Sequence, residues 1–141
     1  MRDEVLATAA RFDARFDELR HRAEAVELRR AALPHDTLAS ASADHSLGQA
    51  RSVIEDERGY LTTARARLQK PSTRAELLRL LDEMRSRLED GITEAGAELS
   101  AVESWVAIAT RGGAPAPPAP PPPEPVDDRA PETDRSGAPI R

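Results

Sequence analysis

The chain has 141 residues, enough for one domain of ordinary size with little left for a second. It contains no cysteine, which excludes disulfides and thiolate chemistry, and its formal net charge is −5. No segment carries the basic surplus that binding to nucleic-acid phosphates requires; residues 1–33, for example, hold seven acids and seven bases. We therefore expect no nucleic-acid partner.

The sequence also argues against a membrane protein. Its first residues, MRDEVL, are acidic and lack the apolar stretch of a secretory signal. No apolar run approaches the ~18 residues needed to span a bilayer. These features predict a soluble, cytoplasmic protein without a membrane partner.

Residues 3–33 are predicted to form the first helix, because apolar side chains recur there at alternating steps of three and four, the heptad spacing of a coiled coil. This stripe consists of Val5, Ala9, Phe12, Phe16, Leu19, Ala23, Val26, Arg30 and Leu33. Both phenylalanines of the chain, from the near-duplicated tetrads RFDARFDE, lie on it. The charged neighbours flank the stripe in two rows, Arg15, Arg22 and Arg29 on one side and Asp13, Arg20 and Glu27 on the other.

Pro34 ends the first helix, and a second is expected over residues 46–69, with an earlier start at residue 37 left open. Residues 35–46 are rich in alanine, serine and threonine and fit either a loop or a frayed turn, whereas Ser46 and Gln49 have capping-box spacing. The second stripe consists of Leu47, Ala50, Ile54, Glu57, Leu61, Ala64 and Leu68. Val53 and Tyr60 add a neighbouring row, as a helix needs when it touches two others.

A third helix is expected over residues 73–110, and Thr73 with Glu76 again has capping-box spacing. Its stripe consists of Leu77, Leu81, Met84, Leu88, Ile92, Ala95, Leu99, Val102, Val106 and Ala109. The step from Leu88 to Ile92 follows another step of four, so the repeat stutters beside Gly91. We favour a continuous helix; the alternative is a break at Gly91 that produces four helices.

Short connectors at Pro34 and Pro71 predict antiparallel neighbours, and hence an all-α, up-down-up three-helix bundle or coiled coil over residues 1–111. The first and third helices then run parallel. The acidic surface between residues 88 and 110 has no base, so the arginine row of the first helix is a plausible partner for it.

Residues 112–141 hold ten of the twelve prolines and are predicted to form a disordered tail, with polyproline II over residues 115–125. Several PxxP matches occur there, but they lack the flanking basic or aromatic residues of known ligand classes. A spacer is therefore favoured over a dedicated ligand.

No set of residues points to catalysis. His21, His35 and His45 have no ligand spacing, and the carboxylates are spread as helix-surface charge. We expect no enzymatic activity, no metal or other cofactor, and no small-molecule substrate.

Six residues are candidates for interaction. Phe12 and Phe16 mark the stripe of the first helix. Arg30 and Glu57 are polar residues on apolar stripes, and they either specify register or partner, or stay hydrated. We expect the Arg30 side chain to reach water, because it lies near a helix end. For Glu57 a role in register or partner choice and a hydrated side chain are equally well supported. A contact between the two would support antiparallel pairing.

Tyr60 and Trp105 each come one position before a stripe residue. Aromatic residues at a helix flank anchor some interfaces, but here widening of the chain's own core is favoured. The predicted function is a non-enzymatic scaffold or adaptor module that binds a protein partner or itself through its helices, with the tail as spacer or recruitment segment. The alternatives are an amphipathic helical protein coating a lipid or granule surface, or a small helical cargo of a dedicated secretion system.

Overall fold

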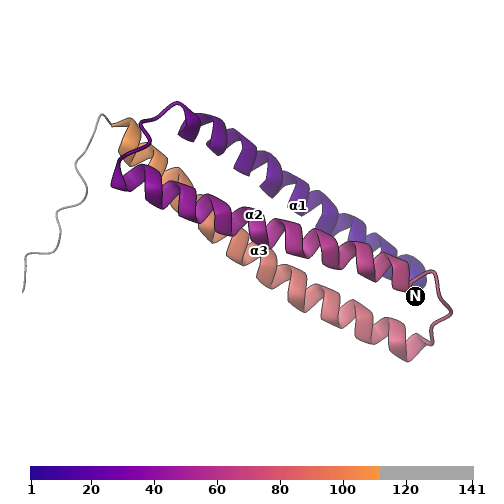
Figure 1. Cartoon of the computed structure of the whole chain (residues 1–141). Coiled ribbons are helices and arrows are strands. Elements are labelled where there is room, and N and C mark those ends of the chain that lie inside the picture. Colours follow the sequence, from indigo (N-terminus) through magenta and orange to yellow (C-terminus); the bar gives the residue numbers. More distant parts are fainter. Residues whose placement is uncertain (112–141) are drawn as a thin grey trace, which may run out of the picture.

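The computed structural model describes residues 1–111, which form three long helices: α1 (Arg2–Ala31), α2 (Leu38–Arg67) and α3 (Arg74–Thr110). Within these residues there is no strand. Short turns join the helices, so α2 runs antiparallel to both others and α1 runs parallel to α3 (Figure 1). The predicted all-α, up-down-up bundle is confirmed, whereas the predicted tail lies outside the described residues.

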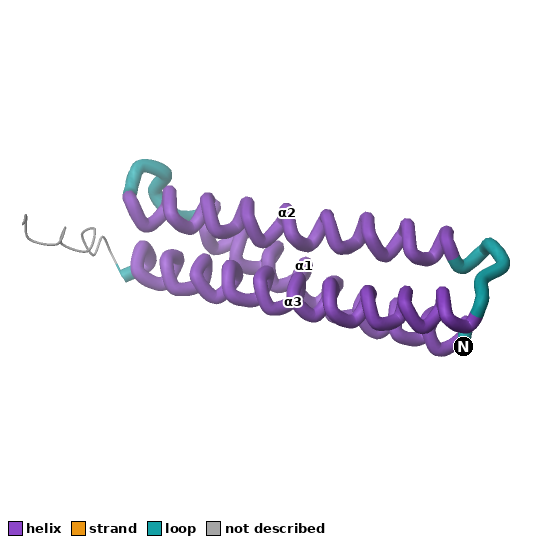
Figure 2. Tube along the Cα trace, turned by 90° about the horizontal axis from the view of Figure 1, so that it is seen from below, coloured by secondary structure: helices purple, strands orange, loops and turns teal. Residues whose placement is uncertain are grey.

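The bundle is elongated, and two views at right angles show the three helices side by side along its whole length (Figures 1 and 2). The N-terminus lies beside the turn that joins α2 to α3. The turn between α1 and α2 lies at the opposite end, beside the end of α3. With 37 residues, α3 is ~55 Å long at ~1.5 Å per residue.

The helix starts are set by capping side chains. Thr37 is extended and its side chain accepts a hydrogen bond from the backbone N–H of Ser40 at 3.0 Å, so α2 begins at Leu38. The predicted start at Ser46 is therefore wrong, since Ser46 is buried inside the helix, and the earlier start at residue 37 that the sequence left open is the one found. At α3 the predicted capping box is present, with reciprocal bonds of 3.1 and 2.8 Å between Thr73 and Glu76.

The early start of α2 has a physical reason. Serine and threonine are only moderate helix formers, but residues 38–46 also contain alanines that pack against the other helices. Ala39, Ser40 and Ala43 are all buried, so tertiary packing stabilises a segment whose composition alone fits a loop equally well.

α3 is continuous through Asp90 and Gly91, which confirms the favoured prediction and rules out a break. Gly91 is buried on the face that packs against α2. A glycine inside a helix costs ~1 kcal/mol relative to alanine. Its presence here is explained by Glu57 of α2, whose side chain lies against it.

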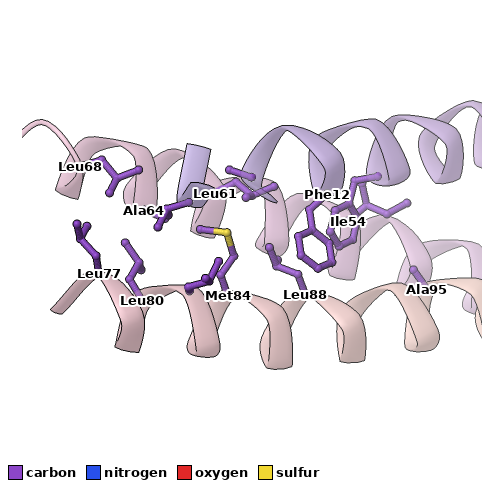
Figure 3. Packing of buried hydrophobic residues seen from close by; sticks show 14 residues of the cluster. Phe12, Ile54, Leu61, Ala64, Leu68, Leu77, Leu80, Met84, Leu88 and Ala95 are labelled. Atoms are coloured by element: carbon purple, nitrogen blue, oxygen red, sulfur yellow. The ribbon is translucent and has the colours of Figure 1, made fainter. Parts of the chain in front are cut away.

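The heptad stripes of the three helices meet in two consecutive hydrophobic clusters. The larger one lies toward the N-terminal end, where Phe12 of α1 and Leu61 of α2 pack over Met84 and Leu88 of α3 (Figure 3). The smaller cluster, toward the other end, consists of Ala23, Val26, Ala43, Leu47, Ala50, Leu99, Val102 and Val106. Burial of each large side chain stabilises the fold by ~1.5–3 kcal/mol, so these stripes supply the main driving force for folding.

Candidate functional site

Phe12 and Phe16 lie inside the bundle. Phe12 is 5% exposed and Phe16 is fully buried, and the guanidinium of Arg15 lies 5.8 Å from the centre of the Phe12 ring. The two rings therefore belong to the chain's own core, and the stripe of α1 is already occupied by α2 and α3.

Arg30 lies at the end of the bundle opposite the N-terminus and is held by three neighbours. Its Nε and Nη2 atoms each donate to a carboxylate oxygen of Asp44 at 2.8 Å, a bidentate pair between α1 and α2. Nη2 also lies 3.3 Å from Nδ1 of His35, and Nη1 donates to the carbonyl of Leu33 at 3.5 Å. The Arg30 side chain is only 6% exposed, so the expectation that it reaches water is wrong.

The reason lies in the position of α2. Because α2 starts at Leu38, Asp44 is already on a formed helix and faces the last turn of α1. A buried guanidinium is stable when a carboxylate satisfies its donors.

Glu57 forms the second polar cluster, between α2 and α3. Its side chain is 10% exposed, and its Oε1 accepts a hydrogen bond of 2.7 Å from Nε of Arg87. The guanidinium of Arg87 lies in turn 4.5 Å from the centre of the Tyr60 ring, a cation–π geometry. On the opposite side Glu57 lies against Gly91, where an added Cβ would come within 2.6 Å of Oε2.

Arg30 and Glu57 do not bond to each other, since each has its own ionic partner. The proposed contact between them therefore does not form. Antiparallel pairing of α1 with α2 follows instead from other ion pairs, in which Asp17 bonds to Arg58 at 2.7 Å while Arg30 bonds to Asp44 farther along α1.

Tyr60 and Trp105 are both half-buried and pack against the chain's own core, Tyr60 on the larger cluster and Trp105 on the smaller. Burial raises the pKa of Tyr60 to about 12, and the negative charge of Glu83 adds to this effect. The Tyr60 hydroxyl is buried and has no hydrogen-bond partner among residues 1–111. These contacts support the interpretation that both residues widen the core.

The two charged rows of α1 face different helices. On the α3 side, Arg15 lies 3.6 Å from Glu89, and Arg22 donates two hydrogen bonds of 2.8 Å to Glu103. These bonds lower the pKa of Glu103 and raise that of Arg22. The predicted pairing of the arginine row with α3 is confirmed for Arg15 and Arg22, whereas the third member, Arg29, forms no ion pair within residues 1–111.

On the α2 side the partners are Asp13 with Arg65, and Glu27 with Arg51. All of these surface pairs are partly exposed, so each stabilises the fold by at most ~1 kcal/mol. Their geometry selects the register of the helices.

Several hollows lie on the surface of the bundle. A groove of about 550 Å³ between α1 and α2 contains Arg20, Arg51 and Arg58. One of about 500 Å³ lies at the turn between α2 and α3. A smaller hollow of about 170 Å³ lies between α1 and α3 and is lined by Thr8, Arg11, Phe12, Arg15, Arg85 and Glu89.

Among residues 1–111, no group of three or more histidine, aspartate or glutamate side chains is arranged to hold a metal ion. None of the three described helices combines the length and the apolar character that crossing a bilayer demands.

Sequence reasoning found Arg30 and Glu57 but missed their partners Asp44 and Arg87. Both partners lie beside a stripe, in positions shared by many other charged residues. Of the residues around Glu57, only Gly91 could have been singled out from the sequence, because it lies at the stutter of the heptad repeat.

Comparison with known proteins gave no match, whether to protein families, to curated proteins or to solved structures.

Proposed function

We propose that this protein is a non-enzymatic interaction module, a scaffold or adaptor in the cytoplasm, that binds a protein partner through the outer surface of its closed bundle. The observation that carries this proposal is the exposure of two leucines at one end of the bundle, while the heptad stripes are buried. Leu28 near the end of α1 is 75% exposed and Leu38 at the start of α2 is 52% exposed, whereas Leu6 and Leu78, toward the opposite end, are 39% and 42% exposed.

The surroundings of these leucines favour a protein partner. They flank the turn between α1 and α2, which lies beside the end of α3 (Figure 1), and half-buried Leu33 and Trp105 pack against the smaller cluster. Single exposed leucines are common on soluble proteins, but the two most exposed leucines of residues 1–111 share this end, and neighbouring exposed apolar residues are typical of an interaction surface. An apolar side chain of a partner would remove this surface from water.

The test is a double substitution, Leu28→Glu with Leu38→Glu, in the full-length chain. A partner recovered by affinity capture should be lost, and any dimer seen by size-exclusion chromatography with light scattering should dissociate. Leu78→Glu is the matched control, because Leu78 is 42% exposed near the start of α3, at the opposite end, and its substitution should leave binding unchanged. A strictly monomeric wild-type chain that captures no partner would contradict the proposal.

A function in coating a lipid or granule surface has less support. It requires the apolar stripes to contact the surface, but the phenylalanines of α1 are buried in the bundle. The helix would have to leave the core and expose side chains whose burial is worth several kcal/mol. Flotation with liposomes would separate the two functions, and we expect the protein to remain in the lipid-free fraction.

A further inference from the structure

The hollow between α1 and α3 carries an excess of positive charge. Three of its lining residues are arginines, Arg11, Arg15 and Arg85, and only one, Glu89, is an acid. Arg15 pairs with Glu89 at 3.6 Å, and Arg11 donates to the hydroxyl of Thr8 at 3.0 Å. Neither Arg11 nor Arg85 forms an ion pair within residues 1–111, so two guanidinium charges in the hollow are not neutralised there.

The groove between α1 and α2 provides an internal comparison, because it also contains three arginines. There each arginine has an acidic partner: Arg20 pairs with Asp17 and Glu24, Arg58 with Asp17, and Arg51 with Glu27. Arginine content alone therefore does not distinguish the two surfaces. The excess charge does, and it indicates that the α1–α3 hollow is better suited to an anionic group than the α1–α2 groove.

Charge is also separated along the bundle. The contacts of Asp17 with Arg58 and of Glu57 with Gly91 mark its middle. The half with the N-terminus, residues 1–16 and 57–91, contains eleven bases and nine acids. The other half, residues 17–56 and 92–111, contains six bases and eleven acids. A negatively charged segment is therefore repelled by the half in which α3 ends and attracted by the half that holds the hollow.

The chain itself contains such a segment. Residues 124–128 read EPVDD, with three carboxylates and no base, so they complement the two free guanidinium groups. Twelve residues separate Arg111 from Glu124, and at full extension they reach ~40 Å. The basic groups of the hollow lie within that reach, since Arg85 is 25 residues, or ~38 Å, from Thr110 along α3.

We propose that the acidic segment from Glu124 to Asp128 docks in the hollow between α1 and α3, with its carboxylates on Arg11 and Arg85. This site is at a distance from the exposed leucines of the proposed interaction surface, so the two proposals stand or fall separately.

The absence of cysteine permits a direct test with a spin label. Val126→Cys in the full-length, ¹⁵N-labelled chain would carry a nitroxide, and paramagnetic broadening of the amide signals would report its position. At low salt we expect at least a twofold loss of intensity for amides around Arg11 and Arg85. The loss should disappear at ~1 M salt, where the Debye length is ~3 Å.

Two sets of substitutions test the site itself. Arg11→Gln with Arg85→Gln should abolish the local broadening, and so should Glu124→Gln with Asp127→Asn and Asp128→Asn, which leaves the bundle unchanged. Arg74→Gln with Arg79→Gln is the matched control, because it removes two positive charges from the same half of the bundle, outside the hollow. This control should retain the broadening.

Three results would overturn the proposal. Broadening that is absent or lies elsewhere on the bundle would show that the segment does not occupy the hollow. Equal loss in the control variant would show attraction to the basic half in general. In a mixture of spin-labelled ¹⁴N chains with unlabelled ¹⁵N chains, full broadening would assign the docked segment to a second copy.

Discussion

Gly91 occupies a position where α3 has no room for a side chain. The carboxylate of Glu57 lies directly over it, with Cγ at 2.8 Å and Oε2 at 2.6 Å from the place of an added Cβ. A glycine that lowers helix propensity thus allows a polar residue of α2 to lie close to α3. The Glu57 carboxylate is then oriented toward Arg87.

Gly91→Ala should therefore destabilise the protein although alanine is the better helix former. We expect a loss of ~1–3 kcal/mol, typical of overpacking, measured as a lower urea midpoint. The control is Gly96→Ala, which has no atom within 4 Å of the new Cβ and should gain up to ~1 kcal/mol. Equal effects at both glycines would contradict the explanation, and adding Glu57→Ala should relieve the strain at position 91.

Arg30 shows the same dependence of a buried charge on its neighbour. Asp44→Ala would leave the guanidinium without its carboxylate in a site that is 6% exposed. The expected cost is ~1.5–3 kcal/mol, the range for hydrogen bonds to charged groups. Chemical denaturation of the variant measures it.

Glu27→Ala serves as the comparison for Asp44→Ala, because it removes one partner of an exposed pair with Arg51. The expected cost there is below ~1 kcal/mol. If both substitutions cost the same, burial of Arg30 does not determine the strength of its ion pair.

At the scale of the helices, α1 is an element with one apolar stripe and two charged edges. One edge bonds to α3 through Arg15 and Arg22, and the other bonds to α2 through Asp13 and Glu27. Because α2 and α3 run in opposite directions, each edge of α1 lies beside a different sequence of charges. The charged edges therefore help to define both register and direction, while the stripe supplies most of the stabilisation.

Charge exchange across α1 and α3 tests this role. Arg22→Glu should lower the thermal midpoint at low salt by a few degrees, and less at high salt, since it places two acids together at the site of Glu103. Adding Glu103→Arg should restore most of the midpoint. Arg29→Glu should have a smaller effect, because Arg29 acts on Glu103 only through longer-range electrostatics. An unchanged midpoint at every salt concentration would refute the pairing.

At the scale of the whole molecule, the three helices form an elongated rod (Figure 2). Its core consists of the two hydrophobic clusters that the apolar stripes form. Most of its charged side chains therefore lie on the outside, where ion pairs join the helices. The carboxylates of these pairs include groups with a lowered pKa, namely Glu103 beside Arg22 and Asp17 beside Arg58. Stability should consequently depend on pH in the acidic range.

The direction of that dependence follows from the lowered pKa values. Each carboxylate binds its proton less readily in the folded state, so its stabilisation is complete above the unfolded-state pKa and is lost as the pH falls through the folded-state pKa. For Glu103 the decline starts below its ordinary value of 4.5. Urea unfolding from pH 7 to pH 2 should show falling stability.

Glu103→Gln is the control for this dependence. The free energy of unfolding of this variant should fall between pH 7 and pH 2 by less than that of the wild type. The difference should be at most ~1 kcal/mol, because the pair is partly exposed. A decline that is identical in Glu103→Gln and wild type would exclude a contribution from this pair.

The sequence by itself determined the features that depend on local spacing. The steps of three and four placed Phe12 and Phe16 on a buried stripe, Thr73 and Glu76 marked the start of α3, and the prolines separated the helices. These are properties of one helix at a time, so periodicity and capping chemistry reveal them. The order and direction of the helices then followed from the short connections.

Only the tertiary structure decided which polar groups meet. Arg30 was expected in water and is buried against Asp44, and α2 begins well before Ser46 because its alanines pack against neighbouring helices. Glu57 was ambiguous until Arg87 and Gly91 were placed beside it. The physical reason is common to all three. The free-energy cost of burying a charge, or of ordering a weak helix, depends on which residues of another helix lie beside it. Those residues change with each shift in the register between the helices.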